Sequence, residues 1–294
     1  MKTIRFTAQT VRSCFRTWHN APRMLVLLGM ISCFTVIYAV PFAENAKAQE
    51  QKLQIMEAFV AMTNWRFSML LFSSSVLLLF GDLPVIEPFT GNALIKGSRR
   101  SWITGQLIYV AVTSLILTVF IAAVSVLACL PGITITDGWS RPVKMLALNG
   151  RIAISPERMK LPFPKSVVTQ YTPWEAFGYS FSLFFLMACF YGLASMALRI
   201  RYKSAGFVIL LAVNAISWAV GMFGVSTGEY AVLSTLSVHY HASLAAHENT
   251  LANKLLPGLD VSYMILTGLL VLFAAISYIL VRKYDYISME ADHT

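Results

Sequence analysis

The sequence predicts an all-α membrane protein with six transmembrane helices. Hydrophobic residues make up 57% of the chain, charged residues make up only 13%, and the mean hydropathy is +0.65. These values are far from those of an average soluble domain. A helix needs roughly 20 apolar residues to cross a hydrocarbon core of about 30 Å. The windows that meet this requirement are 24–42, 64–81, 106–130, 176–198, 204–228 and 261–281.

The charge content of these windows supports their assignment as spans. Five of them contain no Asp, Glu, Lys or Arg, so they enter lipid without a charge penalty. Window 64–81 contains Arg66, close to one end, where its stem can snorkel to the interface. The second predicted span is therefore the one with the weakest signal.

Residues 1–23 predict an interfacial amphipathic helix. The apolar stripe consists of Ile4, Ala8, Val11, Phe15 and Trp18, and the polar stripe of Arg5, Gln9, Arg12, Arg16 and His19. Both stripes have helical spacing. The basic stretch is long and no small-residue cleavage site follows the first span, which argues against a cleavable signal peptide. The helix is either a topogenic anchor or a contact for a cytoplasmic partner.

Lys and Arg at the span ends predict the orientation. Five basic residues and no acid precede the first span, and Arg199, Arg201 and Lys203 lie in the tight fourth linker. We therefore expect a multi-pass membrane protein with the N-terminus and the tail 282–294 in the cytoplasm. The net charge of +9 is explained by attraction to anionic membrane lipid and needs no nucleic acid.

Two outer insertions, about 131–175 and 228–260, interrupt the six-span transmembrane domain 24–281. The first contains the turn dipeptides Asp137-Gly138 and Asn149-Gly150, and the second dipeptide lies between 143–148 and 151–154. This pattern predicts a small β-hairpin in an extracytoplasmic cap. The second insertion is more apolar than a free loop and predicts short helices that dip into the outer leaflet.

No motif in the chain predicts catalysis, a bound cofactor or a metal. The four cysteines have no CxxC spacing. His239, His241 and His247 with Glu248 do not have a specific metal-ligand spacing. We interpret them as interfacial histidines on a short helix, facing the exit of a pathway; their clustering around one outer site would instead favour a membrane-embedded enzyme. Segment 91–98 lacks the order of a phosphate-binding loop.

The linker between the second and third windows, 81–106, differs from its flanks. It carries Asp82, Glu87, Lys96, Arg99 and Arg100 and two prolines. The prolines restrict the chain just after the span, and the charges can pair with charges on a partner. We expect a short cytoplasmic element at the membrane surface, either a coupling segment or simply a solvated basic loop.

Four sequence patterns resemble the permease subunits of the ABC-transporter type-2 exporter family. They are FGDLP at 80–84, SRRSWITGQ at 98–106, GWSRPVKMLA at 138–147 and YTPWEAF at 171–177. The resemblance is closest to the small six-span permeases that Gram-positive bacteria encode beside a separate ATPase. It implies an interfacial N-terminal helix, a coupling helix between the second and third spans, and outer re-entrant helices between the fifth and sixth.

The resemblance implies an exporter of a peptide, lipid-like or amphipathic compound. The chain would pair with itself or with a homologous permease, and ATP and Mg would be bound by partner ATPase subunits rather than by this chain. The residues expected to couple to the ATPase are Glu87, Lys96, Arg99, Arg100 and Trp102. The substrate path is not predicted. The alternative is a six-span membrane sensor or peptide-immunity protein without an ATPase.

Overall fold

The structure is a computed structural model that describes residues 2–19, 22–85, 98–130, 132–150, 152–154, 162–227, 231–247 and 256–282. Among these residues, five helices are long and apolar enough to cross a membrane: Met24–Ala48, Arg99–Ala128, Pro173–Tyr202, Ser204–Gly221 and Leu259–Arg282. These helices confirm the predicted class of all-α membrane protein, and the sixth span stays a prediction. The chain is an all-α, multi-pass membrane protein.

The described helices and strands span most of the chain. In order they are α1 Lys2–His19, α2 Pro22–Ala48, β1 Leu53–Gln54, α3 Glu57–Asn64, α4 Arg66–Leu79, α6 Arg99–Ala128, β2 Ile133–Thr134, α7 Arg141–Asn149, α8 Lys165–Gln170, α9 Pro173–Tyr202, α10 Ser204–Thr227, α11 Ala231–Ser234, α12 Val238–Ala242, the 3₁₀ helix η1 Leu244–His247 and α13 Leu259–Arg282.

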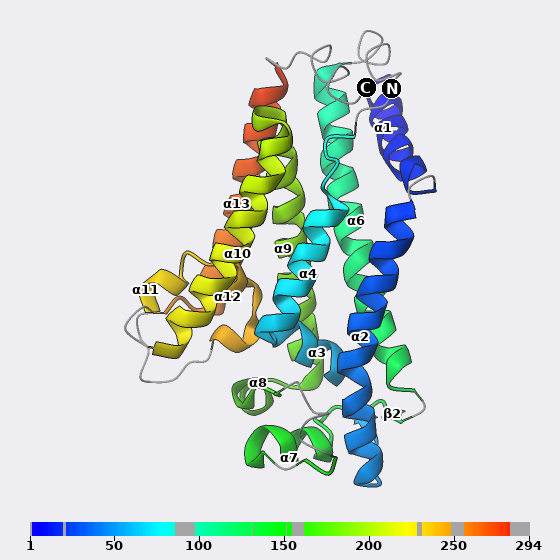
Figure 1. Ribbon diagram of the computed structural model, residues 1–294, viewed down its shortest axis with the longest axis vertical. Helices are drawn as coiled ribbons and strands as arrows, with labels where there is room; N and C mark the ends of the chain where they lie inside the picture. Colours follow the sequence, from blue (N-terminus) through cyan, green and yellow to red (C-terminus); the bar gives the residue numbers. More distant parts are fainter. Residues whose placement is uncertain are drawn as a thin grey trace.

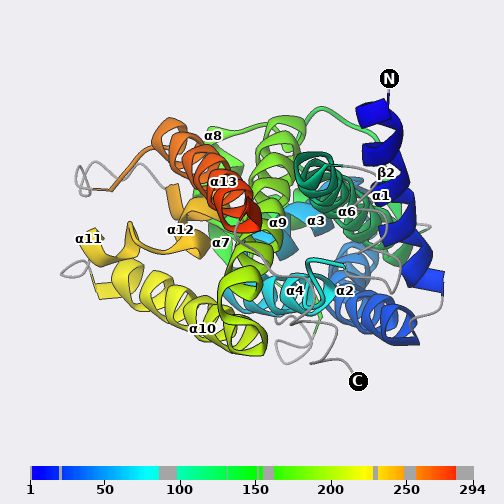
Figure 2. The same cartoon turned by 90° about the horizontal axis from the view of Figure 1, so that it is seen from above.

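The long helices run alternately in opposite directions along one bundle (Figure 1). α1, the start of α6 and the end of α13 lie together at what we call the α1 end, and α7 and α8 lie at the opposite α7 end. The Arg99 guanidinium at the start of α6 donates to the Arg282 carbonyl, 2.8 Å away, at the end of α13. Viewed along the bundle, α9 lies in the middle and packs against α13, α10, α4 and α6 (Figure 2).

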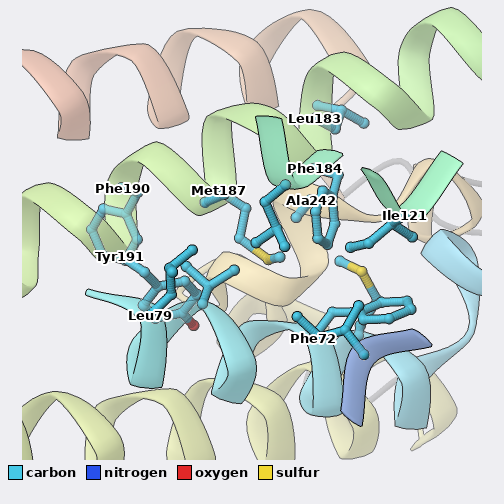
Figure 3. Packing of buried hydrophobic residues seen from close by; sticks show 14 of the residues in the cluster. Phe72, Leu79, Ile121, Leu183, Phe184, Met187, Phe190, Tyr191 and Ala242 are labelled. Atoms are coloured by element: carbon cyan, nitrogen blue, oxygen red, sulfur yellow. The ribbon is translucent and has the colours of Figure 1, made fainter. Parts of the chain in front are cut away.

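The core is built around α9, the most deeply buried of the candidate spanning helices. Phe184, Met187 and Tyr191 of α9 are fully buried. The rings of Phe72 on α4 and Phe184 meet edge to face with centroids 5.9 Å apart. Figure 3 shows Ala242 of α12 beside Phe184, within the same cluster. A short helix from the second insertion therefore belongs to the core of the bundle.

The N-terminal helix is confirmed as Lys2–His19, and it packs on the first turns of α6. The Thr7 hydroxyl donates to the Ser101 carbonyl at 3.3 Å, and the Trp18 indole donates to the Tyr109 hydroxyl at 2.6 Å. A Cβ at Gly105 would lie 2.6 Å from the Cβ of Thr10, so only glycine permits this close approach. Its position at a membrane interface stays a prediction.

The second predicted span, 64–81, is not one continuous helix. α4 has 14 residues, and the preceding α3 is separated from it by Trp65, whose backbone is extended at φ −93° and ψ 131°. The Ser68 hydroxyl donates to the carbonyls of Met62 and Trp65, and the Asn64 amide donates to the Val60 carbonyl. The Ser68 hydroxyl thus supplies the Met62 carbonyl, in the last turn of α3, with a donor that the break removes.

The predicted β-hairpin at the α7 end is wrong. Residues 143–148 lie inside the helix α7, which begins after the N-cap Ser140 and has Pro142 in its first turn. Gly150 has φ +61°, the left-handed conformation that ends a helix, so Asn149-Gly150 is a helix stop and not a hairpin turn. Among the described residues the strands are β1 and β2, which pair in parallel, Leu53 with Ile133 and Gln54 with Thr134.

A buried carboxylate fastens these strands to α7. The side chain of Glu57 is fully buried. Its Oε1 accepts the Ser140 backbone N–H at 2.6 Å, and its Oε2 accepts the Ser140 hydroxyl at 2.7 Å and the Gln54 N–H at 2.9 Å. Burial raises the pKa of Glu57 from 4.5 to about 7, against the opposite effect of these three donors and of Lys144.

The Glu57 carboxyl should make stability depend on pH. Because its pKa is higher in the folded chain than in the unfolded one, the stability it contributes is complete below pH 4.5 and is lost as the pH rises through about 7. A shift of this size corresponds to about 3 kcal/mol in the free energy of unfolding. We expect Glu57→Gln to remove this pH dependence, measured by chemical unfolding in detergent from pH 4.5 to 8.

The matched control is Asp137→Asn, which removes an exposed carboxyl at the same α7 end of the bundle. It should keep the wild-type dependence on pH. If Glu57→Gln and wild type lose stability in parallel over this range, the assignment to Glu57 is incorrect.

Candidate functional site

The structure describes three of the five predicted coupling residues, all in the first turns of α6. Glu87 and Lys96 lie outside the described residues. Arg99 donates to the carbonyls of Val281 and Arg282 and so holds the end of α13. Trp102 is 3% exposed and packs inside the bundle. Of the three, Arg100 alone has an exposed side chain without such a packing role.

The chain that leads into the linker is clamped by α6 and α9. The Gln106 side-chain amide bonds both backbone groups of Val85, accepting its N–H at 3.3 Å and donating to its carbonyl at 3.1 Å. The Ser195 hydroxyl donates to the Phe80 carbonyl at 2.9 Å. Arg199 donates to the Gly81 carbonyl, and its guanidinium lies 3.9 Å from the Asp82 carboxylate. Residues 80–85 are thus fixed to two helices.

The short helices predicted between the last two windows are confirmed as α11, α12 and η1. α12 packs against α9, α10 and α13, and all five of its residues are buried. Gly221 on α10 makes room for it, since a Cβ there would lie 2.6 Å from the Ser237 hydroxyl. The segment 237–247 therefore enters the bundle as a re-entrant turn, and its backbone lies against protein.

His239 lies between two helices of the bundle. Its Nε2 lies 3.0 Å from the hydroxyl of Ser73, half-way along α4, and its Nδ1 lies 3.2 Å from the hydroxyl of Ser217 on α10. The Ser73 hydroxyl donates its hydrogen to the Leu70 carbonyl at 3.0 Å, so it accepts from His239 Nε2. The Nδ1 of the ring then accepts from the Ser217 hydroxyl. Burial lowers the pKa of His239 to about 4, which keeps it neutral at pH 7.

The other two histidines meet at Ser262 on α13. The Ser262 hydroxyl lies 2.8 Å from His241 Nδ1 and 2.6 Å from His247 Nε2. The remaining nitrogens contact carbonyls, His241 Nε2 to Thr235 and His247 Nδ1 to Ser243, each at 2.7 Å. A carbonyl only accepts, so each ring carries its hydrogen on the carbonyl side. The single hydroxyl hydrogen of Ser262 then serves one ring at a time.

Asn64 joins this segment to the break before α4. Its amide nitrogen donates to the Ser180 hydroxyl on α9 at 2.8 Å, as well as to Val60. Its amide oxygen accepts the Ala245 N–H of η1 at 2.9 Å. One buried side chain therefore bonds α3, α9 and η1 together.

A cavity of about 330 Å³ opens beside this junction. Its lining joins α4, α10, the re-entrant segment and the chain before α8. The aromatic side chains are Trp65, Trp218 and Tyr240, and the polar ones are Asn64, Arg66, His239 and Ser243. The Trp218 indole donates to the Arg66 carbonyl at 2.9 Å, which holds one wall in place. Rings and hydroxyl or amide groups on one surface suit an amphipathic ligand.

The histidines do not form a metal site in the part of the chain that the structure describes. No group of three or more His, Cys, Asp or Glu side chains there could hold an ion. His239 and the His241–His247 pair use different partners, and Glu248 lies outside the described residues. The prediction of histidines on a short helix is confirmed for His239 and His241 on α12, while His247 lies on η1. All three are buried, and their position at a membrane interface stays a prediction.

Sequence reasoning missed the polar partners of this site. Asn64, Ser180 and Ser262 are isolated small polar residues at the ends of apolar windows and carry no motif. The sequence could have pointed to them in one way: a side-chain amide or hydroxyl in lipid is unfavourable in free energy without a partner, so each implies a hydrogen-bond partner on another helix. Comparison with known proteins adds nothing to these assignments: no family model, curated protein or solved structure matches the chain.

The Asn64 junction predicts a local effect of mutation. Asn64→Ala removes the acceptor of the Ala245 N–H and the partner of Ser180, and an unsatisfied buried polar group costs about 1–3 kcal/mol. We expect segment 237–247 to exchange its backbone hydrogens faster, by about tenfold or more, in hydrogen exchange followed by mass spectrometry. Thr104→Ala at the α1 end, which also removes a side-chain hydrogen bond, should leave this segment unchanged.

The two histidines at Ser262 should hold opposite tautomers at neutral pH. Burial lowers the pKa of both rings, that of His247 to about 4, so both are neutral at pH 7. Nitrogen-15 NMR of histidine-labelled protein should then show His241 protonated on Nε2 and His247 on Nδ1. The variants His241→Gln and His247→Gln assign the signals. The same tautomer at both positions would contradict the arrangement around Ser262.

Proposed function

We propose that the chain is the transmembrane permease subunit of an ATP-driven exporter of the ABC type-2 kind. In this proposal α3 and α4 together provide a sixth crossing, and the α1 end faces the cytoplasm. ATP and Mg are bound by separate ATPase subunits beneath the linker. The chain pairs with a second copy or with a homologous permease, and the cargo is a peptide, lipid-like or amphipathic compound.

The observation that carries the proposal is the clamping of residues 80–85. A linker that receives force from an ATPase must be fixed to the spans, because a free loop would absorb the movement. Gln106 holds Val85 through two hydrogen bonds, and Ser195 and Arg199 hold the carbonyls of Phe80 and Gly81. The linker 86–97 therefore starts from a point that moves with α6 and α9.

The position of the cavity is consistent with this role. α9 carries Ser195 and Arg199 near its end and Ser180 near its start, and Ser180 bonds Asn64 at the cavity wall. A tilt of α9 would act on the cavity. The mixture of rings and polar groups in its lining favours an amphipathic cargo over an inorganic ion.

The first test is co-purification from the native membrane in mild detergent. We expect the wild-type chain to retain a partner that hydrolyses ATP. The double variant Glu87→Lys with Lys96→Glu should lose it, since it reverses the two charges of segment 86–97 and leaves the net charge unchanged. The control Asp137→Lys with Lys165→Glu makes the same exchange between two exposed residues of 131–175 and should retain the partner. Loss in both variants, or no ATP-hydrolysing partner with wild type, contradicts the proposal.

A second test separates attachment from coupling. In Gln106→Leu the clamp on Val85 is lost, while the charges of the linker stay. We expect this variant to keep its ATPase but to lose the ATP-dependent change in maleimide labelling of Ser243→Cys, which reports on the cavity. An ATP-dependent change of the same size with and without Gln106 would show that the clamp transmits nothing.

A further inference from the structure

A second, larger hollow lies at the α1 end, away from the cavity described above. It is a groove of about 800 Å³ between α1 and the first turns of α6. Ile4, Ala8 and Val11 of α1 form one apolar wall, and Ile108 of α6 forms the other. Ile4 is 75% exposed and Ile108 is 42% exposed, so no part of the chain that the structure describes covers the groove.

Two arginines lie on the rim of this groove. Arg12 comes from α1 and Arg100 from α6, and both side chains are exposed. Among the described residues, neither guanidinium has a hydrogen bond or an ion pair. α1 contains no Asp or Glu at all, so no acid on this helix balances them. The groove therefore combines an apolar floor with uncompensated positive charge.

The apolar floor continues along α6 beyond the groove. The side chains that extend it are between 37% and 50% exposed, and they are Ile108, Val112, Leu115, Ile116 and Val119. From Ile108 to Val119 the helix rises by about 16 Å. An aliphatic chain that starts in the groove thus finds an uninterrupted apolar path down the outer face of the bundle.

We propose that the groove between α1 and α6 binds one anionic phospholipid. The phosphate of the lipid lies between Arg12 and Arg100, and an acyl chain lies against Ala8, Val11 and Ile108. Guanidinium groups suit this headgroup because they are always charged and bond phosphate oxygens in pairs. The site holds α1 to α6 through the lipid and does not depend on the proposed transport function.

The charges argue against a second protein copy as the occupant. A two-fold contact at this face would be self-complementary, with the same patch on both copies. It would bring two copies of Arg12 and Arg100 together, four positive charges in one interface, and like charges in contact oppose association. A lipid with a negative headgroup meets the same surface with opposite charge.

The test is lipid selectivity of the purified full-length chain. The protein in neutral detergent is mixed with equal amounts of phosphatidylglycerol and phosphatidylcholine, and the bound lipids are weighed by native mass spectrometry. We expect wild type to prefer phosphatidylglycerol. Arg12→Gln with Arg100→Gln should lower this preference about 30-fold, because each surface arginine contributes about fivefold to binding of an anionic lipid.

Two further variants distinguish a site from general attraction. Ala8→Trp fills the groove and keeps both charges, and it should also lose the bound phosphatidylglycerol. Arg141→Gln with Arg201→Gln removes two exposed arginines elsewhere and should keep the wild-type preference. All variants are first compared with wild type by thermal unfolding without added lipid. An unchanged preference in the Arg12 and Arg100 variant, full binding by Ala8→Trp, or an equal loss in the Arg141 and Arg201 variant would each overturn the proposal.

Discussion

The side-chain amide of Asn64 is the interaction on which the interior of this bundle depends. It donates to the Val60 carbonyl of α3 and to the Ser180 hydroxyl on α9, and it accepts the Ala245 N–H of η1. Inside a bilayer no water replaces such a partner, so irregular backbone is stable only where protein groups satisfy it. The break at Trp65 and the re-entrant segment are therefore mutually dependent, because each supplies partners that the other lacks.

Glu57 has the corresponding role at the α7 end. Its hydrogen bonds to Gln54 and Ser140 join the chain after α2 to the chain after α6. Because Glu57 is the first residue of α3, the same bonds fix the start of that helix. Asn64 bonds the last residues of the same helix. α3 is thus fixed at both ends by buried polar side chains, and all eight of its residues are buried. This fixed helix sets where α4 starts, and with it the position of the cavity wall.

Local signals explain which parts of this fold the sequence could predict. Five long apolar windows correspond to spanning helices, because hydropathy sums over neighbours in the chain. The break at Trp65 could not be read in this way, since Ser180 and Ala245 are far away in sequence. Asn149-Gly150 suits a hairpin turn and a helix stop equally well, and the N-cap Ser140 decides between them. The histidines were located, but their serine partners lie on other helices.

α9 connects the two polar regions of the molecule. Ser195 holds the Phe80 carbonyl and Ser180 holds Asn64. Ser195 lies fifteen positions after Ser180, which corresponds to about 22 Å of helix. No proline interrupts α9 after Pro173 in its first turn, so the helix can move as one body. A displacement at residues 80–85 would therefore reach the cavity without any rearrangement of the outer segment. In the proposed exporter α9 is one mechanical route from an ATPase beneath the α1 end to a cargo held near His239, beside α4, which joins Phe80 directly to the cavity wall.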